Sequence, residues 1–434
     1  MGAVGTLIGT VTGTLVGTKP GEIALPAGFP WSPTWGIGGG PGRGYRPGLD
    51  PASLVPTPDI TLWVSTSGSD AAAGTSAGAA KRSLFGAWLV LSAGTYDNAR
   101  IWVEAGDYYN DQGWKAVTLG VSSGSPPEVD SLEIIGYGGR VRLLAQDAAL
   151  TYASAGSGAY STTLATAPFG VLDEANLDAY GAPTWLTQQA NLAAVQASGG
   201  WYHSAGTLYV KTADARSPDR WIVAAKTGLA GMNVNNAGCS AFQRGLDWIG
   251  FTTGFSGFTA NRIGAEDCRF RGNQTQGTSC TTITDAYFFR CTADASYNGD
   301  GFVYSSAGVA LEVDCVGVSN GRNASNINNG STAHGATVIR CGGRYQNNEG
   351  PNVADVSSSK SLTLGAVIGA SRAAAGTQRA NVASDGATGK MYLADCVLDG
   401  AGTQDLYTLN AGSTIYLRAT GYNGAAGVGS VGVW

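Results

Sequence analysis

Apolar and polar residues alternate with a period of two in short stretches that recur along the second half of the chain. Several of these stretches end at a cysteine, as in Phe289-Arg290-Cys291, Val313-Asp314-Cys315 and Ile339-Arg340-Cys341. Clusters of Gly, Asn, Ser and Asp separate them. A period of two bounded by turn residues predicts short β-strands rather than helices.

The cysteines at positions 268, 291, 315, 341 and 396 mark a repeat, with spacings of 23, 24, 26 and 55 residues. The last spacing has room for two repeats, and Ala366 is expected in the place of the missing cysteine. A repeat of this length indicates one supersecondary unit that stacks on its neighbours. Strand-and-turn units predict a parallel β-solenoid with coils about 4.8 Å apart and the cysteines as a buried column.

Two other interpretations of the cysteines are weaker. The spacing does not show the paired Cys or Cys/His pattern of a zinc site. The total of seven cysteines is odd, and neighbours in a ladder would form strained disulfides. We therefore expect free thiols, a reducing compartment during folding, and neither a metal nor another cofactor.

The pattern along the rest of the chain predicts four regions. A strand is expected at 60–65, a short helix near 80–93, and a hairpin that pairs Tyr202 with residues 208–210. The regions are an extended Gly/Thr/Pro-rich anchoring arm (1–58), an N-terminal cap with the first coils (59–150), a small β insertion (151–235), and the main coils with a C-terminal cap (236–434).

The arm opens with Gly-Thr pairs at every fourth position from 5 to 18 and continues into a Pro/Gly/Trp-rich segment, 24–51. Gly and β-branched residues disfavour a helix, so we expect an extended chain that neighbouring molecules of a larger assembly hold in place. The first basic residue is Lys19, which argues against a cleaved secretory leader.

Composition narrows the function. Of 434 residues, 66 are glycine and only 13% are charged, with a net charge of −5, which is typical of a rigid, turn-rich β protein. The acidic balance and the lack of basic clusters argue against nucleic acid as a partner. The sequence has no long apolar run free of glycine, so membrane insertion is not expected.

Several motifs carry a resemblance to a known class of fold. They are Trp63-Val64-Ser65, Gly68-Ser69-Asp70, Gly74-Thr75, Gly106-Asp107-Tyr108 and Gly136-Tyr137-Gly138-Gly139. Their order resembles the N-terminal cap and first coils of right-handed parallel β-helix proteins. These include pectate-lyase-like enzymes, glycoside hydrolases and, most similar, bacteriophage tailspike and tail-fibre proteins. The resemblance implies an all-β, right-handed parallel β-helix with a capping helix, a β insertion and the arm.

The resemblance also implies a function. We expect a bacteriophage virion protein, either a tail fibre or tailspike or a head fibre, assembled in the host cytoplasm. The arm would bind other virion proteins, the β-helix would bind host surface polysaccharide, and the molecule would be a homotrimer. A glycoside hydrolase or polysaccharide lyase on the same fold, and a purely structural virion component, remain alternatives.

Aromatic residues near polar turns are the candidates for glycan binding, because rings stack on sugars and polar groups bond hydroxyls. The candidates are Tyr297, Asn298, Asp300, Tyr304, Tyr345, Asn347, Trp201 and Tyr202. Each aromatic has an alternative role in packing between turns.

If the protein is an enzyme, Asp300 and Glu349 are the candidate catalytic pair. They lie two coils apart, which corresponds to roughly 10 Å, near the separation of about 6.5–9.5 Å that inverting glycosidases use. The alternative is that acids in Asn/Gly turns accept backbone hydrogen bonds. A lyase would use a basic residue such as Arg322 or Lys360, but the dense acidic cluster that calcium requires is missing. His203 and His334 lack recognisable partners.

Overall fold

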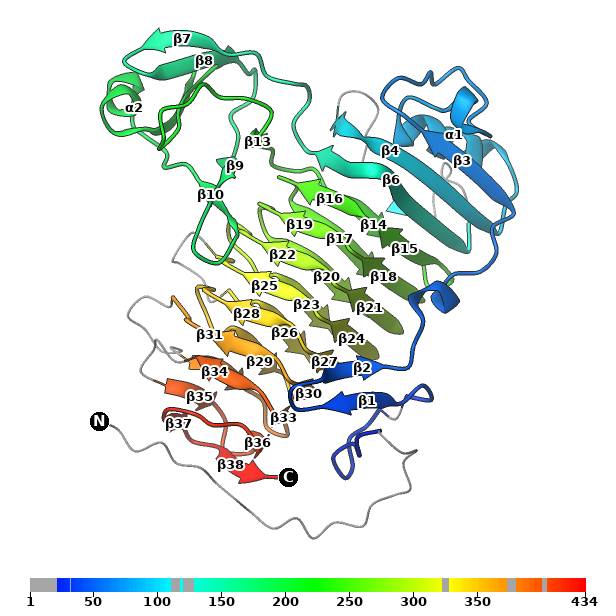
Figure 1. The fold of residues 1–434 in the computed structure, drawn as a ribbon, viewed down its shortest axis with the longest axis vertical. Coiled ribbons are helices and arrows are strands. Elements are labelled where there is room, and N and C mark those ends of the chain that lie inside the picture. The colour runs from blue at the N-terminus through cyan, green and yellow to red at the C-terminus, as the bar shows by residue number, and fades with distance from the viewer. Residues whose placement is uncertain are drawn as a thin grey trace.

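The computed structural model describes residues 22–31, 33–110, 118–119, 129–321, 328–372, 380–399 and 404–434. It shows a long rod of stacked coils, with an insertion projecting beside the upper coils and the arm lying along one side (Figure 1). Each regular coil contributes one strand to each of three sheets, and every strand pairs in parallel with the equivalent strand of the next coil. The predicted all-β parallel β-helix is confirmed.

Sheet 1 runs from the first coil to the last. It contains β3 (Ile60–Val64), the first halves of β4 (Asn98–Tyr109) and β6 (Ser131–Leu144), β15 (Ser240–Arg244), β18 (Arg262–Glu266), β21 (Asp285–Phe289), β24 (Val309–Val313), β27 (Thr337–Cys341), β30 (Lys360–Leu364), β33 (Lys390–Ala394), β36 (Thr414–Arg418) and β38 (Ser430–Val433).

Sheet 2 follows sheet 1 within each coil. It contains the second halves of β4 and β6, β16 (Leu246–Ile249), β19 (Arg269–Arg271), β22 (Thr292–Asp294), β25 (Val316–Val318), β28 (Arg344–Gln346), β31 (Val367–Gly369) and β34 (Val397–Asp399). Sheet 3 closes the coil with β5 (Thr118–Leu119), β14 (Met232–Val234), β17 (Thr253–Phe258), β20 (Gln276–Thr281), β23 (Phe302–Ser305), β26 (Ser331–His334), β29 (Val353–Val356), β32 (Ala380–Ser384), β35 (Gln404–Thr408) and β37 (Ala425–Gly427).

The first coils match the sequence expectation with one addition. The strand predicted at 60–65 is β3, and the helix predicted near 80–93 is α1 (Leu84–Ala93), whose first turn is capped by the Ser83 hydroxyl. One long strand, β6, bends through the glycine turn Gly136-Tyr137-Gly138-Gly139 and contributes to sheets 1 and 2 in succession. A short 3₁₀ segment that the sequence did not indicate, η2 (Ala77–Ala79), precedes α1. In the described part of the chain, no helix is long and apolar enough to cross a membrane.

The corners between the sheets explain the polar residue that precedes Cys268, Cys291, Cys315 and Cys396. Between sheets 1 and 2 the chain turns through a left-handed residue in successive coils, for example Asp267 (φ 54°), Arg290 (φ 51°), Asp314 (φ 51°) and Asp395 (φ 54°). The other corners repeat the device. This conformation disfavours bulky apolar side chains, so small or polar residues mark the corners.

The buried column is confirmed, with one correction. Strand register aligns Cys268, Cys291 and Cys315 with one another, and aligns Ala366 with Cys396, as expected. In the intervening coil Gly343 takes that place, whereas Cys341 lies two residues earlier and pairs with Val313 and Leu364. Cys341 therefore points outward against the arm. Cys341 stands before the corner residue Gly342, whereas the column cysteines of the other coils stand after their corner residue. All seven cysteines are free and buried.

A ladder of buried asparagines follows the corner between sheets 2 and 3. The side-chain oxygen of Asn320 accepts from the Ser296 N–H, and that of Asn348 accepts from the Asn320 N–H, at 3.1 and 3.0 Å. The Asn348 amide group donates to Asn352, which donates to Asn381. Each amide satisfies backbone groups that the sharp corner would otherwise leave without partners.

The insertion forms two antiparallel sheets. They stand between β6, which ends in sheet 2, and β14 of sheet 3, where other coils have only a short corner. One contains β7 (Ala153–Gly156), β8 (Ala159–Thr163), β11 (Gly200–Ser204) and β12 (Thr207–Lys211), and the other contains β9 (Gly170–Leu177), β10 (Pro183–Trp185) and β13 (Ile222–Ala225). The predicted hairpin is present, with Tyr202 opposite Tyr209. A helix that the sequence did not indicate, α2 (Leu192–Ser198), packs on this hairpin.

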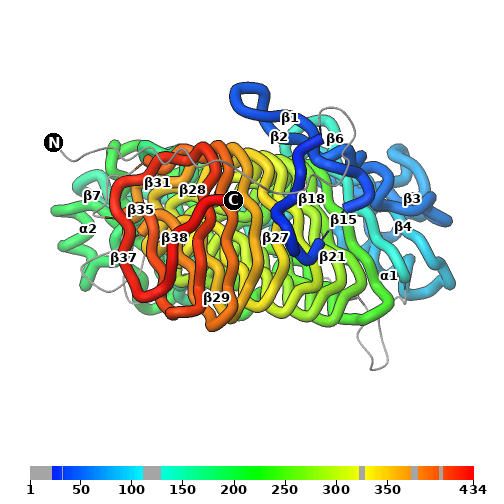
Figure 2. The backbone as a smooth tube through the Cα atoms, turned by 90° about the horizontal axis from the view of Figure 1, so that it is seen from below, coloured from blue at the N-terminus to red at the C-terminus, as the bar shows by residue number. Residues whose placement is uncertain are grey.

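The arm segment, defined here as residues 22–31 and 33–55, lies on the outside of sheet 1 (Figure 2). It includes the hairpin β1 (Ile37–Gly40) and β2 (Gly44–Pro47), and the 3₁₀ turn η1 (Pro51–Leu54). Its apolar side chains cover a strip of outward apolar residues on β21, β24, β27, β30 and β33. The rod itself therefore contacts this segment along sheet 1. The Gly-Thr pairs of 5–18 lie outside the described residues.

Tyr45 fastens the arm segment. Only 1% of its surface is exposed, its ring lies against Gly365, and its hydroxyl donates to Asp395. We expect Tyr45→Ala to lower the free energy of unfolding by about 3 kcal/mol, because it opens a cavity under the arm. Tyr45→Phe, which loses only the hydrogen bond, should cost about 1 kcal/mol. Hydrogen exchange should then show faster exchange in 22–55 for Tyr45→Ala; equal rates in both variants would contradict this account.

Asp355 predicts a pH dependence of stability. Its carboxyl is fully buried inside the coil, and burial raises its pKa from 3.8 to about 6, against the lowering effect of Arg340 and a hydrogen bond from Ser361. Between about pH 4 and pH 6 the folded state binds more protons than the unfolded state, so stability should fall as pH rises through this window. The loss should amount to about 1–3 kcal/mol.

The measurement is the urea unfolding free energy at pH 4.5 and pH 7. Asp355→Asn should reduce the difference in unfolding free energy between pH 4.5 and pH 7, because the amide has no charge to bury. Asp399→Asn, at an exposed carboxyl of β34, serves as the matched control. A pH profile of Asp355→Asn that is identical to that of the unsubstituted protein would show that Asp355 does not cause the effect.

Candidate functional site

Three of the aromatic residues expected to bind glycan have their rings inside the protein. Tyr304 and Tyr345 have no exposed surface and point into the coils, where the Tyr345 hydroxyl donates to Glu312 at 2.7 Å. Trp201 is 2% exposed and belongs to the core of the insertion. None of these rings offers a face to a sugar. Tyr202 is half-buried and stacks on Tyr209 with ring centres 6.2 Å apart.

The candidate acids Asp300 and Glu349 have different surroundings. Asp300 accepts hydrogen bonds from the Asn329 N–H at 2.7 Å and from the Thr332 hydroxyl at 2.8 Å. Burial raises the pKa of Asp300 to about 6, although these hydrogen bonds lower it. Both carboxyl oxygens thus hold the next coil in place, which is the turn-stabilising role considered as the alternative. The Glu349 N–H donates to the Asn320 carbonyl. Burial lowers the pKa of Arg372, and the Glu349 carboxylate partly opposes this effect.

Tyr297, Asn298 and Asn347 lie at the corner between sheets 2 and 3, which the insertion overhangs. The Tyr297 ring meets Trp185 and Phe169 of the insertion edge-on, with ring centres 5.1 and 5.6 Å apart. The side-chain oxygen of the neighbouring Asn298 is buried and has no hydrogen-bond partner. The structure therefore gathers these predicted residues at one junction, which we call the insertion junction.

Four hydrogen bonds attach the β9–β10 hairpin to successive coils at the insertion junction. The Trp185 indole N–H donates to the Ala295 carbonyl at 2.8 Å. Asp178 accepts from the Ser319 hydroxyl at 2.5 Å and from the Asn347 amide at 3.2 Å. Arg344 donates to the Tyr180 carbonyl at 3.0 Å. Asn347 is predicted to bind glycan, but its side-chain amide donates to Asp178 and to Ser319 at this attachment.

Above the junction, sheet 2 carries a row of alternating charges on its outer face. Strand register places Asp107, Arg142, Asp247 and Arg269 at equivalent positions of four successive coils. Beside them, Arg271 pairs with Asp294 at 2.7 Å. Opposite charges at equivalent positions stabilise neighbouring strands.

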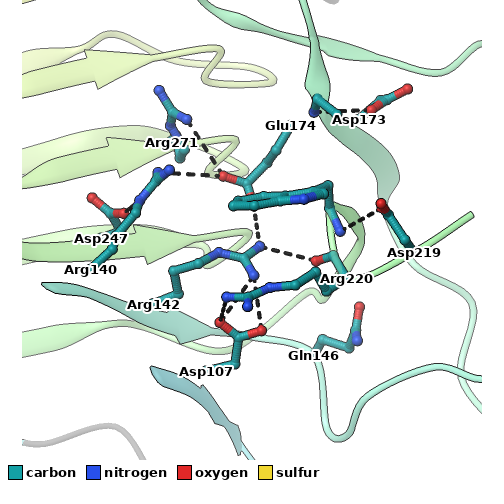
Figure 3. A network of polar contacts seen from close by, with 12 residues as sticks. Asp107, Arg140, Arg142, Gln146, Asp173, Glu174, Asp219, Arg220, Asp247 and Arg271 are labelled. Carbon is teal, nitrogen blue, oxygen red and sulfur yellow. Dashed lines mark hydrogen bonds and ion pairs between the residues drawn. The ribbon is translucent and has the colours of Figure 1, made fainter. Parts of the chain in front are cut away.

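Glu174 of the insertion enters this row and joins the two parts of the molecule (Figure 3). It pairs with Arg142 and lies 3.5 Å from Arg271, and only 1% of its side chain is exposed. Arg142 is fully buried and also pairs with Asp107 at 3.0 Å. The carboxylates raise the pKa of Arg142 despite its burial. A buried group of this kind requires its partners, because an unpaired charge there would be costly.

The ring of Trp221 lies among three guanidinium groups of the same network. Arg142, Arg220 and Arg140 lie 4.6, 5.1 and 5.9 Å from the ring centre. Arg220 and Arg140 are 53% and 35% exposed, so the outer edge of the network presents positive charge to solvent. The carboxylates beneath are paired with arginines. Asp294 has a raised pKa because of burial, but only 1% of it is exposed, so it cannot reach a substrate.

A second surface, which the sequence reasoning missed, lies on the outside of sheet 1 in the first coils. Trp63 of β3 pairs in register with Trp102 of β4; their indoles stack with centres 5.8 Å apart and planes at 21°. Tyr137 of β6 meets both rings edge-on at 5.3 and 6.0 Å. All three are half-buried. We call this set the aromatic platform.

The aromatic platform had a signal in the sequence. The tripeptides Leu62-Trp63-Val64 and Ile101-Trp102-Val103 each place a tryptophan between two residues that point into the coil. The period of two therefore directs both indoles outward. Glu104 lies beside them and accepts from the Ser65 hydroxyl at 2.5 Å, so the platform has polar groups at its edge.

Neither histidine belongs to these surfaces. The His203 ring is hydrogen-bonded to the Leu164 carbonyl at 2.7 Å. Burial lowers the pKa of His334. Within the described residues no group of three or more His, Cys, Asp or Glu side chains is arranged to hold a metal ion. Arg322, a candidate lyase base, lies outside the described residues.

No protein-family model and no curated protein sequence matches this chain. Solved structures with similar folds include a glycoside hydrolase (11% identity, 86% of this chain and 96% of the other, TM-score 0.47). They also include pectate lyase Pel9A (12%, 85% and 71%, TM-score 0.38) and a tailspike of Pseudomonas phage phi297 (9%, 77% and 73%, TM-score 0.25). At such low identities, function must be argued from the residues of this chain.

The charge network predicts how the insertion is held. Glu174→Gln should leave Arg142 and Arg271 without full compensation and lower the free energy of unfolding by about 3 kcal/mol or more. Amide exchange in the insertion should become faster. Asp214→Asn, which removes an exposed partner of Arg216, should change little. If both variants behave alike, the network does not hold the insertion on the coils.

Proposed function

We propose that this protein is a bacteriophage virion spike or fibre that binds a host surface glycan with the outer faces of its β-helix. The aromatic platform is the observation that carries this proposal. It presents three half-buried rings from successive coils at one place on the outside of sheet 1, and these rings are not part of the apolar strip that the arm segment covers.

Ring geometry supports a sugar as the ligand. A pyranose has an apolar face that stacks on an aromatic ring, while its hydroxyls need polar groups at the ring's edge. Trp63 and Trp102 supply adjacent planes, and Glu104 supplies a carboxyl group beside them. The insertion junction, with Tyr297 and Asn298, and the patch around Tyr202 are further places where the same glycan could be held, and they complete the proposed binding face.

The rest of the proposal concerns assembly. A rod of parallel coils is stiff, which suits a protein that projects from a particle. Residues 1–58 would bind other virion proteins, the assembly would be a homotrimer formed in the host cytoplasm, and the rod would project outward.

One observation favours an enzyme as the second candidate function. A carboxyl with a pKa of about 6 is suited to act as a general acid near neutral pH, and Asp300 has such a pKa. In this alternative, the protein would be a glycoside hydrolase or a polysaccharide lyase, with Asp300 and Glu349 as its acids. The hydrogen bonds from Asn329 and Thr332 would first have to release Asp300.

Binding and chain length of bacterial surface polysaccharides, measured together on the full chain, test both functions. We expect retention without shortening of the polysaccharide. Shortening that Asp300→Asn abolishes would establish the enzyme instead. If no polysaccharide in a panel from diverse bacterial envelopes is retained or shortened, a purely structural virion role would replace the proposal.

Two substitutions test whether the aromatic platform binds the glycan: Trp102→Ala and Tyr137→Ala. Loss of one stacked ring should weaken binding roughly 2–10-fold, since such a contact contributes about 0.5–1.5 kcal/mol. Leu89→Ala, at an exposed apolar residue of α1, is the control and should bind normally. If Tyr202→Ala weakens binding while the two platform variants do not, the site lies on the insertion.

A further inference from the structure

Two rows of polar side chains face each other inside the lower coils, where a β-helix core is otherwise apolar. On sheet 1, register places Glu312, Arg340 and Thr363 at equivalent positions of three successive coils. On sheet 3, Tyr304, Asp355 and Ser384 lie in one inward column. None of these six residues has any exposed surface.

Part of this layer is satisfied by direct hydrogen bonds. Glu312 accepts from the Ser331 hydroxyl at 2.5 Å and from the Tyr345 hydroxyl at 2.7 Å. The Arg340 Nε donates to Ser331 at 2.9 Å and lies 3.5 Å from Glu312. One oxygen of Asp355 accepts from Ser361 at 2.6 Å.

Six polar atoms of the same layer have no hydrogen-bond partner among the residues that the structure describes. They are Arg340 Nη1 and Nη2, Asp355 Oδ1, Tyr304 Oη, Thr363 Oγ1 and Ser384 Oγ. Arg340 Nη1 and Asp355 Oδ1 are 3.9 Å apart, beyond a direct hydrogen bond. Each atom would forfeit a hydrogen bond that it makes to water in the unfolded chain, so such groups in folded proteins have partners.

The chemistry of these atoms selects the partner. The guanidinium nitrogens can only donate, an ionised Asp355 can only accept, and the three hydroxyls can do either. An anion would suit Arg340 but would meet Asp355 and Glu312, and a cation would meet Arg340. Water both donates and accepts, and it bridges polar groups that lie too far apart to bond directly.

We propose that the β-helix interior contains a water-binding site, bounded by Arg340 and Thr363 on sheet 1 and by Tyr304, Asp355 and Ser384 on sheet 3. Ordered water molecules there link Arg340 to Asp355 and complete the hydrogen bonds of the hydroxyls. The lower coils are then held together across their interior by solvent as well as by apolar contacts.

A crystal structure of the full chain, at a resolution that shows water, tests this directly. We expect density for water within hydrogen-bond distance of Arg340 Nη1 or Nη2 and of Asp355 Oδ1. Direct contact between the guanidinium and the carboxylate, with no water between them, would overturn the proposal.

Magnetic relaxation dispersion of water in solution provides an independent measurement, because it counts water molecules that stay bound for long times. The triple variant Tyr304→Phe, Thr363→Val and Ser384→Ala should lose part of the dispersion amplitude. Ser413→Ala removes an equally buried hydroxyl that is bonded to the Asn410 carbonyl at 2.7 Å, and it should keep the amplitude. Equal amplitudes in the triple variant and the unsubstituted protein would count against the site. Should the triple variant not fold, the crystal structure of the unsubstituted chain still decides the matter.

Discussion

The parallel hydrogen bonding between successive coils is the constraint on which the rest of this structure depends. It places each residue directly over its equivalent in the next coil, so every position becomes a column. A column of left-handed corners favours small or polar residues, a buried amide column hydrogen-bonds to itself, and a column of partly buried charges is stabilised when the charges alternate in sign. The Asn320–Asn348 ladder and the row from Asp107 to Arg269 are two results of this one rule.

The same constraint decides where variation can occur. A residue inside a regular column is tied to its neighbours, whereas the insertion leaves the rod after β6 and returns before β14. Its attachment therefore needs separate interactions, which Glu174 and Asp178 supply. Surfaces suited to recognition lie where columns end or are interrupted, as at the aromatic platform of the first coils and at the insertion junction.

Much of the fold could be predicted from the sequence because the repeat and the period of two are properties of the local chain. Ala366 was placed correctly in the cysteine column for this reason. The site was harder to predict, because the direction of a side chain depends on how each corner is built. Cys341 lies before its corner rather than after it and therefore faces outward. The strand positions of Tyr304 and Tyr345 direct rings beside polar turns into the core. Contacts between distant segments, such as Glu174 with Arg142, leave no local pattern at all.

The path of the arm segment has a mechanical consequence. The chain contacts the lower coils at Phe29 and Tyr45 before it climbs along sheet 1 to begin the first coil at Ile60. A pull on the N-terminal side of residue 22 would therefore load the side-chain contacts with Tyr392 and Asp395 before it reached any hydrogen bond of the first coil. Such a force would enter the rod near its C-terminal coils, at the opposite end from the first coil, and the first coil would be protected from it.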